Sequence, residues 1–390
     1  MVIQEAWGKN SFRILHGGVI HGNVEGDIVA NIVTKAPELK LDKLERANAF
    51  EFPDPDTALE HCYDRGWTDG LPVALPTEAR VRAILEYADR DPLEVVGIIP
   101  PVGRVATIER IAINAAMAGC PPACFPIVLA AIQAALKPDF NLNGVQATTH
   151  PCAPLVIVGG PVVRELGFNS RDGVFGGGSR ANASVGRAVR LVLWNIGGAK
   201  PGDIDKATFG HPGKYAFCIA EDQENNPWEP LHVSLDRSLG DNGVTVFACE
   251  SPHNVADTHH DKPQSLLWVI ADCMSTMGNS TTRWGGQTLV VLGQERAQVL
   301  KKAGWTREDV QQCLYGQSHR KIREFQTARQ ALRETPKWVN REDPEAIQPV
   351  FNKPEDILVM VAGGDGPHSA ICPGWGRHGG FAVTHQVSLK

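Results

Sequence analysis

Short, almost uninterrupted apolar runs bounded by glycine or polar residues recur along the chain beyond residue 150. Three of them resemble one another in sequence: Pro154–Gly160, Thr288–Gln294 and Ile357–Gly363. A fourth run covers Val244–Cys249. Short apolar runs without polar alternation are typical of strands that are covered on both faces. We therefore predict an α/β protein with a mostly buried sheet and flanking helices.

Apolar residues at helical spacing lie between and before these runs. They predict a helical hairpin that is broken at Gly119–Pro122 and whose second helix spans Phe125–Leu136. The first helix of the hairpin is expected to bury Ile108, Ile111, Ala112, Ala115 and Ala116. Further helices are predicted over Thr57–Arg65, with Asp56 or Thr57 as its cap, and over Thr77–Tyr87, Val185–Ile196 and Leu266–Met277.

The repeated pattern predicts an internal duplication. Pro154–Gly160 and Thr288–Gln294 are each preceded by an apolar helix and followed by similar residues, so a helix–strand–helix unit recurs. The two pseudo-repeats would cover about residues 107–200 and 244–376 and would enclose a cleft. The alternative is that any two α/β units look this similar.

Residues 1–56 have a different character from the α/β body at 57–390. The segments Phe12–Leu15, Gly17–His21 and Asp27–Val33 are short β-like pieces separated by glycines. They predict a β-rich N-terminal arm, which we interpret as a contact of a homo-oligomer. Pro53–Asp56 is the expected linker to the body.

Composition narrows the range of partners. The 390 residues carry a net charge of −6 without a basic cluster, which argues against nucleic acid as a partner. The nine cysteines lack a paired spacing, so we expect free thiols in a reducing, cytoplasmic compartment. The first residues do not resemble a signal peptide and no apolar run is long enough for a membrane span, so we expect neither secretion nor membrane insertion.

The densest group of reactive side chains is the segment Thr148–Cys152, which we interpret as the end of a strand. Hydroxyls, an imidazole and a thiol are the groups that donate hydrogen bonds, transfer protons and attack electrophiles. His150 is the expected general acid or base, Thr148 and Thr149 are hydrogen-bond donors, and Cys152 is a nucleophile. The alternative for Cys152 is a small apolar filler.

A glycine-rich segment predicts an anion site, because successive glycines let backbone N–H groups converge on one point. It contains Gly177, Gly178, Ser179, Arg180 and Asn182. The segment is neither a Walker A loop nor a GxGxxG fingerprint, so no nucleotide cofactor is indicated. The alternative is a surface turn in which Ser184 caps a helix.

Further substrate contacts are expected from polar residues in turns beside predicted strands. They are Lys214, His253, Gly364, His368 and Ser369, and we expect the turns at 144–160, 176–187, 250–254 and 363–369 to meet around one cleft. No HExxH or CxxC spacing occurs, so a metal ion would need ligands from separate segments. The candidates are His150, Glu221, His253 and His368.

Four phrases taken together resemble a poorly characterised bacterial family of cytosolic proteins that is associated with small UGSC-type (seleno)proteins. The phrases are Tyr63–Val73, Ala112–Cys120, Gly144–Pro151 and His211–Tyr215, and the resemblance covers most of residues 57–376. It implies one folded unit and a small thiol or selenol partner protein. The UGSC tetrad itself is absent, and its nearest equivalent is Cys372.

These features together predict an enzyme that acts on a small anionic or carbonyl-bearing metabolite. Hydrolysis, elimination (a lyase reaction) and thiol-dependent redox chemistry are all compatible with the residues. The alternative is a non-catalytic subunit of a two-component complex, which would bind a ligand or a partner's tail.

Overall fold

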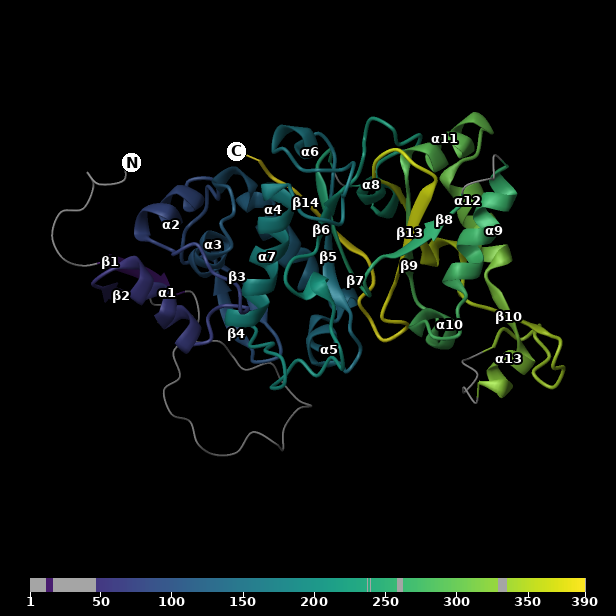
Figure 1. Ribbon diagram of the computed structural model, residues 1–390, viewed down its shortest axis with the longest axis horizontal. Coiled ribbons are helices and arrows are strands. Elements are labelled where there is room, and N and C mark those ends of the chain that lie inside the picture. The colour runs from purple at the N-terminus through teal and green to yellow at the C-terminus, as the bar shows by residue number, and fades with distance from the viewer. Residues whose placement is uncertain are drawn as a thin grey trace.

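Two four-stranded sheets face each other at the centre of the molecule, and helices cover their outer faces (Figure 1). This arrangement, seen in a computed structural model, confirms the predicted α/β class with buried strands and flanking helices. The structure describes residues 12–16, 47–236, 238, 240–257, 262–328 and 335–389.

The first sheet has the strand order β14–β7–β5–β6. Its central strands are β5 (Ala153–Gly159) and β7 (Gly243–Cys249), which are antiparallel and buried throughout. β6 (Cys218–Ala220) is parallel to β5, and β14 (Val383–Gln386) is antiparallel to β7. The core on the outer face of this sheet is shared with three helices, α3 (Ile108–Met117), α4 (Phe125–Ala135) and α7 (Arg180–Asn195).

The second sheet has the order β12–β9–β13–β8. β12 (Ile357–Val361) is parallel to β9 (Thr288–Leu292), and β13 (His368–Pro373) is antiparallel to β9 and to β8 (His253–Ala256). The core on its outer face is shared with α9 (Pro263–Met274) and α12 (Arg307–Gln317).

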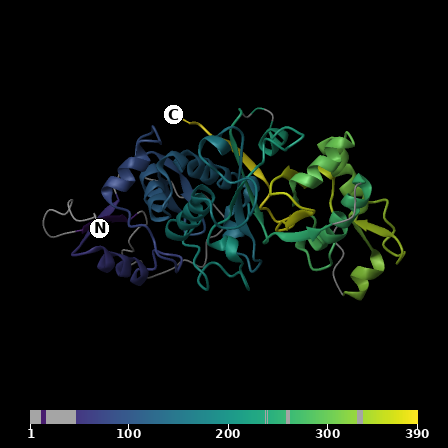
Figure 2. The same ribbon diagram turned by 45° about the horizontal axis from the view of Figure 1, so that its top comes forward.

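The two sheets have the same pattern of one parallel and two antiparallel pairings, and they exchange their edge strands. β8 follows β7 in the chain but joins the second sheet, while β14 follows β13 but joins the first. Figure 2 shows the yellow C-terminal chain crossing back from the green half of the molecule to the teal half. The matched topology supports the predicted internal duplication, which itself stays a prediction.

Successive side chains of a strand point to opposite faces of its sheet. In both sheets the side chains on the inward face form an apolar layer. Leu155 and Ile157 of β5 point into this layer, whereas Val156 and Val158, which alternate with them, face the helices. The second sheet contributes to the same layer in the same way, through Leu289, Val291, Leu358, Met360 and Cys372. Both faces of each sheet are therefore buried, which is why the strands are apolar without alternation.

The predicted helices form, and three local predictions were wrong. α1 (Pro55–Asp64) begins inside the expected linker, because Asp54 caps it by accepting the backbone N–H of Thr57 at 2.7 Å. α7 begins at Arg180 rather than Val185. The segment before Thr148 is the helix α5 (Leu142–Ala147) and not a strand.

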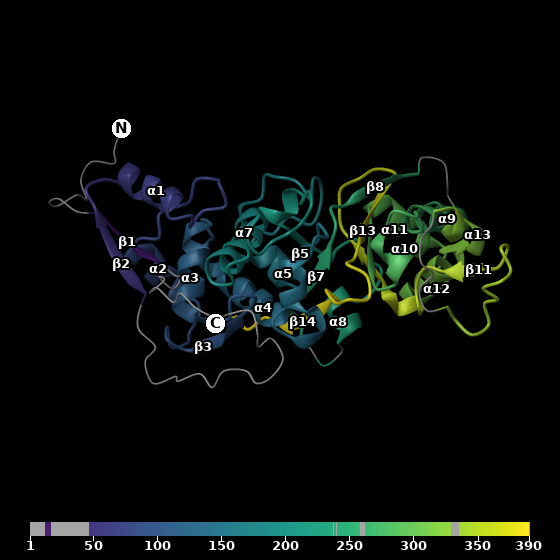
Figure 3. The same ribbon diagram turned by 90° about the horizontal axis from the view of Figure 1, so that it is seen from below.

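The described part of the predicted N-terminal arm is a two-stranded antiparallel ribbon of β1 (Phe12–His16) and β2 (Asn48–Phe52). The predicted β-pieces at 17–21 and 27–33 lie outside the described residues. Figure 3 shows the ribbon at one end of the molecule, beside α1. A second ribbon, of β3 (Val95–Ile99) and β4 (Arg104–Thr107), precedes α3.

The remaining elements are short and lie at the periphery or in connections. In the first half they are α2 (Glu78–Leu85), α6 (Val162–Glu165) and α8 (Leu231–Leu235). In the second half they are α10 (Ser280–Trp284), α11 (Gln294–Lys302), β10 (His319–Lys321), α13 (Ile322–Thr327) and β11 (Ile347–Pro349).

Among the described residues, no single helix combines the length and the apolar character that crossing a bilayer requires. One pair of helical segments, 122–135 and 138–147, meets that requirement together by length and composition, with a bend of 76° between them. Its longer part is the core helix α4, in which all residues except Gln133 are buried.

We predict that Gly374→Ala destabilises the fold by about 1–3 kcal/mol through overpacking. Gly374 pairs with Cys249 where the strands exchange, and an added Cβ would stand 2.4 Å from the carbonyl oxygen of Gln287. The matched control is Gly316→Ala in α12, where an added Cβ meets nothing within 4 Å. Urea unfolding should show the control equal to or more stable than the unaltered chain. Equal stability of both variants would contradict the prediction.

Candidate functional site

One part of the candidate site lies where β5 begins and β7 ends. The antiparallel pairing of Ala153 with Cys249 brings His150 and Glu250 together, and Nε2 of His150 lies 2.9 Å from Oε1 of Glu250. Nδ1 of the same ring accepts the backbone N–H of Cys152 at 3.2 Å. When the His150 ring is neutral, its single N–H is therefore at Nε2, and it donates a hydrogen bond to the Glu250 carboxylate.

A pocket of about 350 Å³ adjoins this pair. Its walls come from the segment 201–215, from α7 and from the loop before α2. Thr208, which lies in this wall, donates from its backbone N–H and its hydroxyl to the carbonyl of Thr149, at 2.9 and 3.3 Å. The wall is thereby attached to the residue before His150. The lining residues with polar or charged functional groups include Asp69, Arg190, Asp205, His211, Lys214 and Tyr215.

Two cations of this pocket share one buried carboxylate. Nζ of Lys214 donates to both carboxylate oxygens of Asp205, at 2.6 and 2.8 Å. Nη2 of Arg190 lies 4.0 Å from the same carboxylate, and its Nε donates to the Lys214 carbonyl at 3.0 Å. The side chains of Arg190 and Asp205 are only 6% and 4% exposed, so both charges depend on this pairing.

The same arrangement tunes the amine of Lys214. Burial lowers the pKa of Lys214, the ion pair with Asp205 opposes that shift, and the charge of Arg190 adds to it. Burial also lowers the pKa of Arg190, but a guanidinium stays protonated at neutral pH. A buried lysine beside a permanent cation gives up its proton more readily than a free lysine. Lys214 is thus the group of this pocket best suited to proton transfer.

His211 is a neutral, fixed wall of the pocket. Its Nδ1 accepts the backbone N–H of Gly213 at 3.1 Å, and its ring stands edge-on to Phe217. Nε2 is buried and has no hydrogen-bond partner among the described residues. Burial lowers the pKa of His211, while the nearby carbonyl of Cys249 and the charge of Glu250 work against the shift. Glu250 therefore lies close to His211 as well as to His150.

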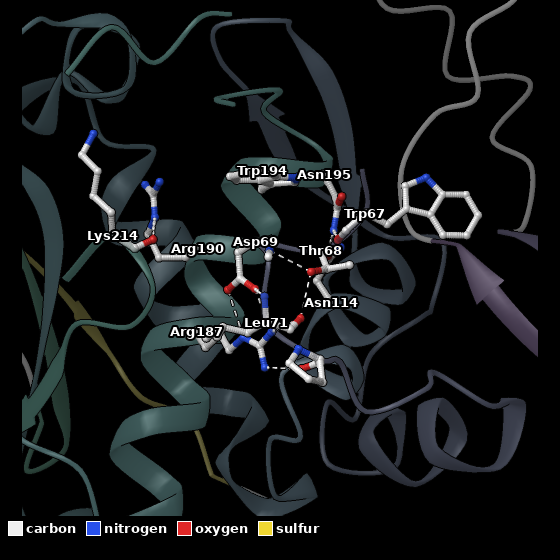
Figure 4. A network of polar contacts seen from close by, with 12 residues as sticks. Trp67, Thr68, Asp69, Leu71, Asn114, Arg187, Arg190, Trp194, Asn195 and Lys214 are labelled. Carbon is white, nitrogen blue, oxygen red and sulfur yellow. Dashed lines mark hydrogen bonds and ion pairs between the residues drawn. The ribbon is translucent and has the colours of Figure 1, made fainter. Parts of the chain in front are cut away.

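A polar network holds the loop before α2 against α7 and so places Asp69 at the pocket (Figure 4). The Arg187 guanidinium donates to both oxygens of Asp69, at 2.8 and 3.0 Å, and also to the carbonyls of Leu71 and Pro72. About two turns further along α7, Nε1 of Trp194 donates to the carbonyl of Gly66 at 2.8 Å. A bidentate arginine and a tryptophan at this spacing fix the loop in one orientation.

The amide of Asn195 extends this network into the core. It donates to the Trp67 carbonyl at 3.0 Å and to the Asn114 side chain of α3 at 2.8 Å. Both asparagines are buried, and the Asn114 amide also donates to the Arg110 carbonyl at 2.9 Å, so both side chains have hydrogen-bond partners. The loop, α3 and α7 are therefore joined by hydrogen bonds as well as by apolar packing.

The predicted glycine-rich anion site stays a prediction, because most of its polar groups have partners within the protein. Gly177 and Gly178 are exposed, and a Cβ added to either would meet nothing within 4 Å. The Arg180 guanidinium donates to the carbonyl of Gly119 instead, at 3.0 and 3.1 Å. Ser179, rather than Ser184, is the helix cap.

The remaining residues of that segment also have structural partners. Ser179 and Asn182 are bonded to each other at the start of α7, with 2.7 Å between Oγ and Oδ1. The Asn182 amide donates to the carbonyls of Asn169 and Cys218, which anchors α7 to the chain before α7 and to β6. From Ser179 onward the segment is the start of α7, whereas Phe175 and Gly176 before it line a pocket with Gly364 and His368.

The environment of Cys152 does not favour its predicted activation. Its side chain is buried, with 1% of the residue exposed, and burial raises the pKa of the thiol to about 12. The His150 ring is turned to the Cys152 backbone and to Glu250. Because the thiolate is the nucleophile, a thiol with a raised pKa packs as an apolar residue.

Three other predicted residues gather at a different place. Gly364, His368 and Ser369 line a pocket of about 330 Å³ at the carboxyl ends of β9 and β12, together with Asn254. It shares no lining residue with the pocket of Lys214. The predicted single cleft is therefore divided, and Lys214 lies in one pocket while these three residues lie in the other. His253, exposed at the start of β8, lines neither pocket.

Thr148 and Thr149 lie in the turn before β5. The hydroxyl of Thr148 accepts the backbone N–H of His150 at 3.1 Å, and Thr149 is exposed. Their polar groups therefore shape the turn before β5. Neither lines the pocket that contains Lys214.

Glu221 directly follows β6, and its carboxylate binds neighbouring segments of the chain. Its carboxylate accepts the Asn226 amide at 2.7 Å and the backbone N–H of Leu231 at 2.8 Å, with Arg307 at 4.0 Å. Burial raises the pKa of Glu221 to about 7. In the described part of the chain, no three histidine, cysteine or acidic side chains converge as metal ligands, so the four predicted candidates do not form one site.

A larger pocket, of about 970 Å³, lies at the carboxyl ends of β5 and β6. It has no histidine, lysine or cysteine in its lining, and the charge of Arg171 is neutralised by Glu224 at 2.5 Å and by Asp222 at 3.6 Å. Volume alone does not make a reactive site, so we place the candidate site at the pocket of Lys214.

Sequence reasoning missed most of the residues that surround Lys214, namely Asp69, Arg187, Arg190, Asp205 and Glu250. The signal that could have found two of them is the spacing of Arg187 and Arg190, which places two cations on one face of a helix otherwise rich in apolar residues. Asp205 lies in an irregular segment and gives no such signal.

No protein-family model, no curated protein and no solved structure matches this chain. The resemblance to the UGSC-associated family stays a prediction. What the chain does is therefore inferred from the chemistry of its own residues.

We predict that Cys152 is alkylated late. In the folded protein at neutral pH, iodoacetamide should modify the partly exposed Cys273 and Cys313 before Cys152, because Cys152 is both buried and high in pKa. Mass spectrometry of tryptic peptides after timed quenching gives the order. Modification of Cys152 ahead of the other two would restore it as a nucleophile.

We predict that Glu221→Gln removes a pH dependence of stability. The folded pKa of about 7 exceeds the ordinary 4.5, so wild-type stability falls as pH rises from about 4.5 to 7 and is level above that. The loss is at most about 3 kcal/mol. Urea unfolding at several pH values should show a flatter profile for Glu221→Gln, while Glu355→Gln, at an exposed position, keeps the wild-type slope.

Proposed function

We propose that this chain is an enzyme that acts on a small anionic or carbonyl-bearing metabolite by acid–base chemistry, as a hydrolase or a lyase. The observation that carries the proposal is the buried arrangement of Lys214, Asp205 and Arg190 in one pocket of metabolite size. Titratable groups with shifted pKa values that converge in a pocket are frequent at active sites.

Each group of the pocket has a role in this proposal. Arg190 supplies a permanent positive charge, which favours an anionic substrate or the negative charge that develops on a carbonyl oxygen. Lys214 transfers the proton, since burial and Arg190 both lower its pKa. Asp205 holds the Lys214 ammonium in place and compensates its charge before substrate binds.

The pair of His150 and Glu250 takes a supporting part. Both nitrogens of His150 are already engaged, by the Cys152 backbone and by Glu250, which leaves the ring less able to accept a substrate proton than expected. The Glu250 side chain is 29% exposed and uses one oxygen for His150. We therefore assign proton transfer to Lys214 and place His150 as the residue that orients Glu250.

Two other functions were compatible with the sequence, and the structure bears on them differently. Thiol-dependent redox chemistry is not favoured, because Cys152 is buried with a raised pKa. A non-catalytic, ligand-binding subunit would use the same charged pocket, and only a measurement of turnover separates it from an enzyme.

Three variants test the proposal. Lys214→Met removes the amine, and Lys214→Arg keeps the positive charge on a group that does not give up its proton. Lys206→Met changes an exposed lysine that donates to the Gly202 carbonyl. A panel of small carboxylic acids, keto acids and aldehydes is screened by thermal unfolding, and the ligands found are followed by proton NMR for conversion.

We expect a ligand of the panel to raise the melting temperature of the unaltered chain and of Lys206→Met, but not of Lys214→Met. Lys214→Arg should still bind it, with turnover reduced roughly 100- to 10,000-fold, as is typical for loss of a general acid or base. Binding without conversion by the unaltered chain would favour the non-catalytic alternative. Full turnover by Lys214→Met would remove Lys214 from the mechanism.

A further inference from the structure

A second charged pocket lies on the other side of Trp194 from Lys214. It has a volume of about 500 Å³ and shares Trp194 with the pocket of Lys214. Its walls come from four separate places in the chain: the end of β1, the end of α1, the start of β4, and the end of α7 with the turn that follows. We call it the cationic pocket, and define it by His16, Arg65, Trp67, Arg104, Trp194 and Lys200.

Positive charges dominate this pocket among the described residues. Arg65, Arg104 and Lys200 line it, and two carboxylates, of Asp64 and Asp203, do so as well. Burial lowers the pKa of Arg104, and burial followed by the charge of Arg104 lowers the pKa of Lys200, with Asp203 opposing. The two half-buried cations therefore repel each other, and an anion between them would relieve the repulsion.

His16 lies in the wall of the pocket, and the same positive charges affect its pKa. It is 5% exposed and lies flat on Trp67, with ring centroids 3.8 Å apart and 15° between the planes. Burial, then the charges of Arg65, Arg104, Lys200 and Arg110, lower the pKa of His16 to about 3. Its Nδ1 is buried and has no hydrogen-bond partner among the described residues, and a ligand would supply one.

The two tryptophans give the pocket rigid walls. Trp194 is fixed by its bond to the Gly66 carbonyl, and Lys200 Nζ lies 5.9 Å from its ring centroid. Gly66 has a φ of +61°, and a Cβ there would stand 3.0 Å from Lys200 Nζ. The absence of this side chain leaves room for the ammonium, which is held over the ring.

We propose that the cationic pocket binds a phosphate group, either as inorganic phosphate or as a small phosphate monoester. Three cations from separate elements match a dianion that accepts several hydrogen bonds at once, and they exceed what a single carboxylate needs. The volume is larger than one phosphate, which leaves space for an attached organic group between the tryptophan rings. This site is independent of the chemistry proposed for Lys214.

The test is calorimetric titration of the full chain with inorganic phosphate and, separately, with phenyl phosphate, at neutral pH and low ionic strength. We expect one saturable site. Lys200→Met and Arg65→Met should each weaken phosphate binding roughly 10- to 100-fold, since each removes a charged hydrogen-bond donor. Arg65 is exposed, so its variant keeps the fold even if Lys200→Met does not.

Two further variants test whether phosphate binds in the cationic pocket. His16→Phe keeps a ring on Trp67 and removes the unpartnered nitrogen, and it should weaken binding about tenfold. Lys301→Met, on an exposed position of α11 in the other half of the molecule, changes the net charge equally and should bind like the unaltered chain. Tighter binding of phenyl phosphate than of inorganic phosphate would identify the monoester as the ligand class, and equal affinity would identify phosphate itself.

Three results would overturn the proposal. The first is that the unaltered chain shows no saturable phosphate binding. The second is that Lys200→Met and Arg65→Met, folded by circular dichroism, bind as the unaltered chain does. The third is that Lys214→Met abolishes phosphate binding while Lys200→Met leaves it intact, which would place the anion in the pocket of Lys214.

Discussion

The apolar layer between the two sheets is the contact on which the rest of the molecule depends. Each sheet has only four strands and would expose one apolar face if it stood alone. Packing the two inner faces together buries both, and the exchange of β8 and β14 makes each sheet incomplete without the other half of the chain. The two halves therefore form one cooperative unit. The candidate site lies where β5 begins and β7 ends, and this end of the first sheet is held by both halves.

A second constraint acts at this end of the sheet. Charges as deeply buried as those of Arg190 and Asp205 are tolerated only when they are paired and hydrogen-bonded. Their pairing with Lys214 fixes the 205–215 segment against α7, and Arg187 does the same for the loop that carries Asp69. The contacts that stabilise this region are the same contacts that shift the pKa of Lys214, so its stability and its proposed chemistry are inseparable.

The candidate site was only partly predictable from the residues. Lys214, one of the expected substrate contacts, lines the pocket in which we place the candidate site, and the segment Thr148–Cys152 lies beside it. The roles predicted for these residues came from side-chain chemistry alone and stay predictions. Cys152 is silenced by burial, Arg180 is used by the Gly119 carbonyl, and Gly177 lies in open space. A reactive side chain can take part in a functional site only if the folded protein leaves it accessible and not already bonded to other groups of the protein.

The sequence by itself determined the local structure: apolar runs specified the buried strands, and side chains such as Thr77 specified where helices begin, because these effects act between near neighbours. Only the tertiary structure decided which strands pair and what meets beside them. His150 and Glu250 are 100 residues apart, and Arg187 and Asp69 are 118 apart. Such contacts follow from the registers of β5 with β7 and of α7 with its neighbours, which depend on the packing of the whole core and leave no trace in the spacing of the residues along the chain.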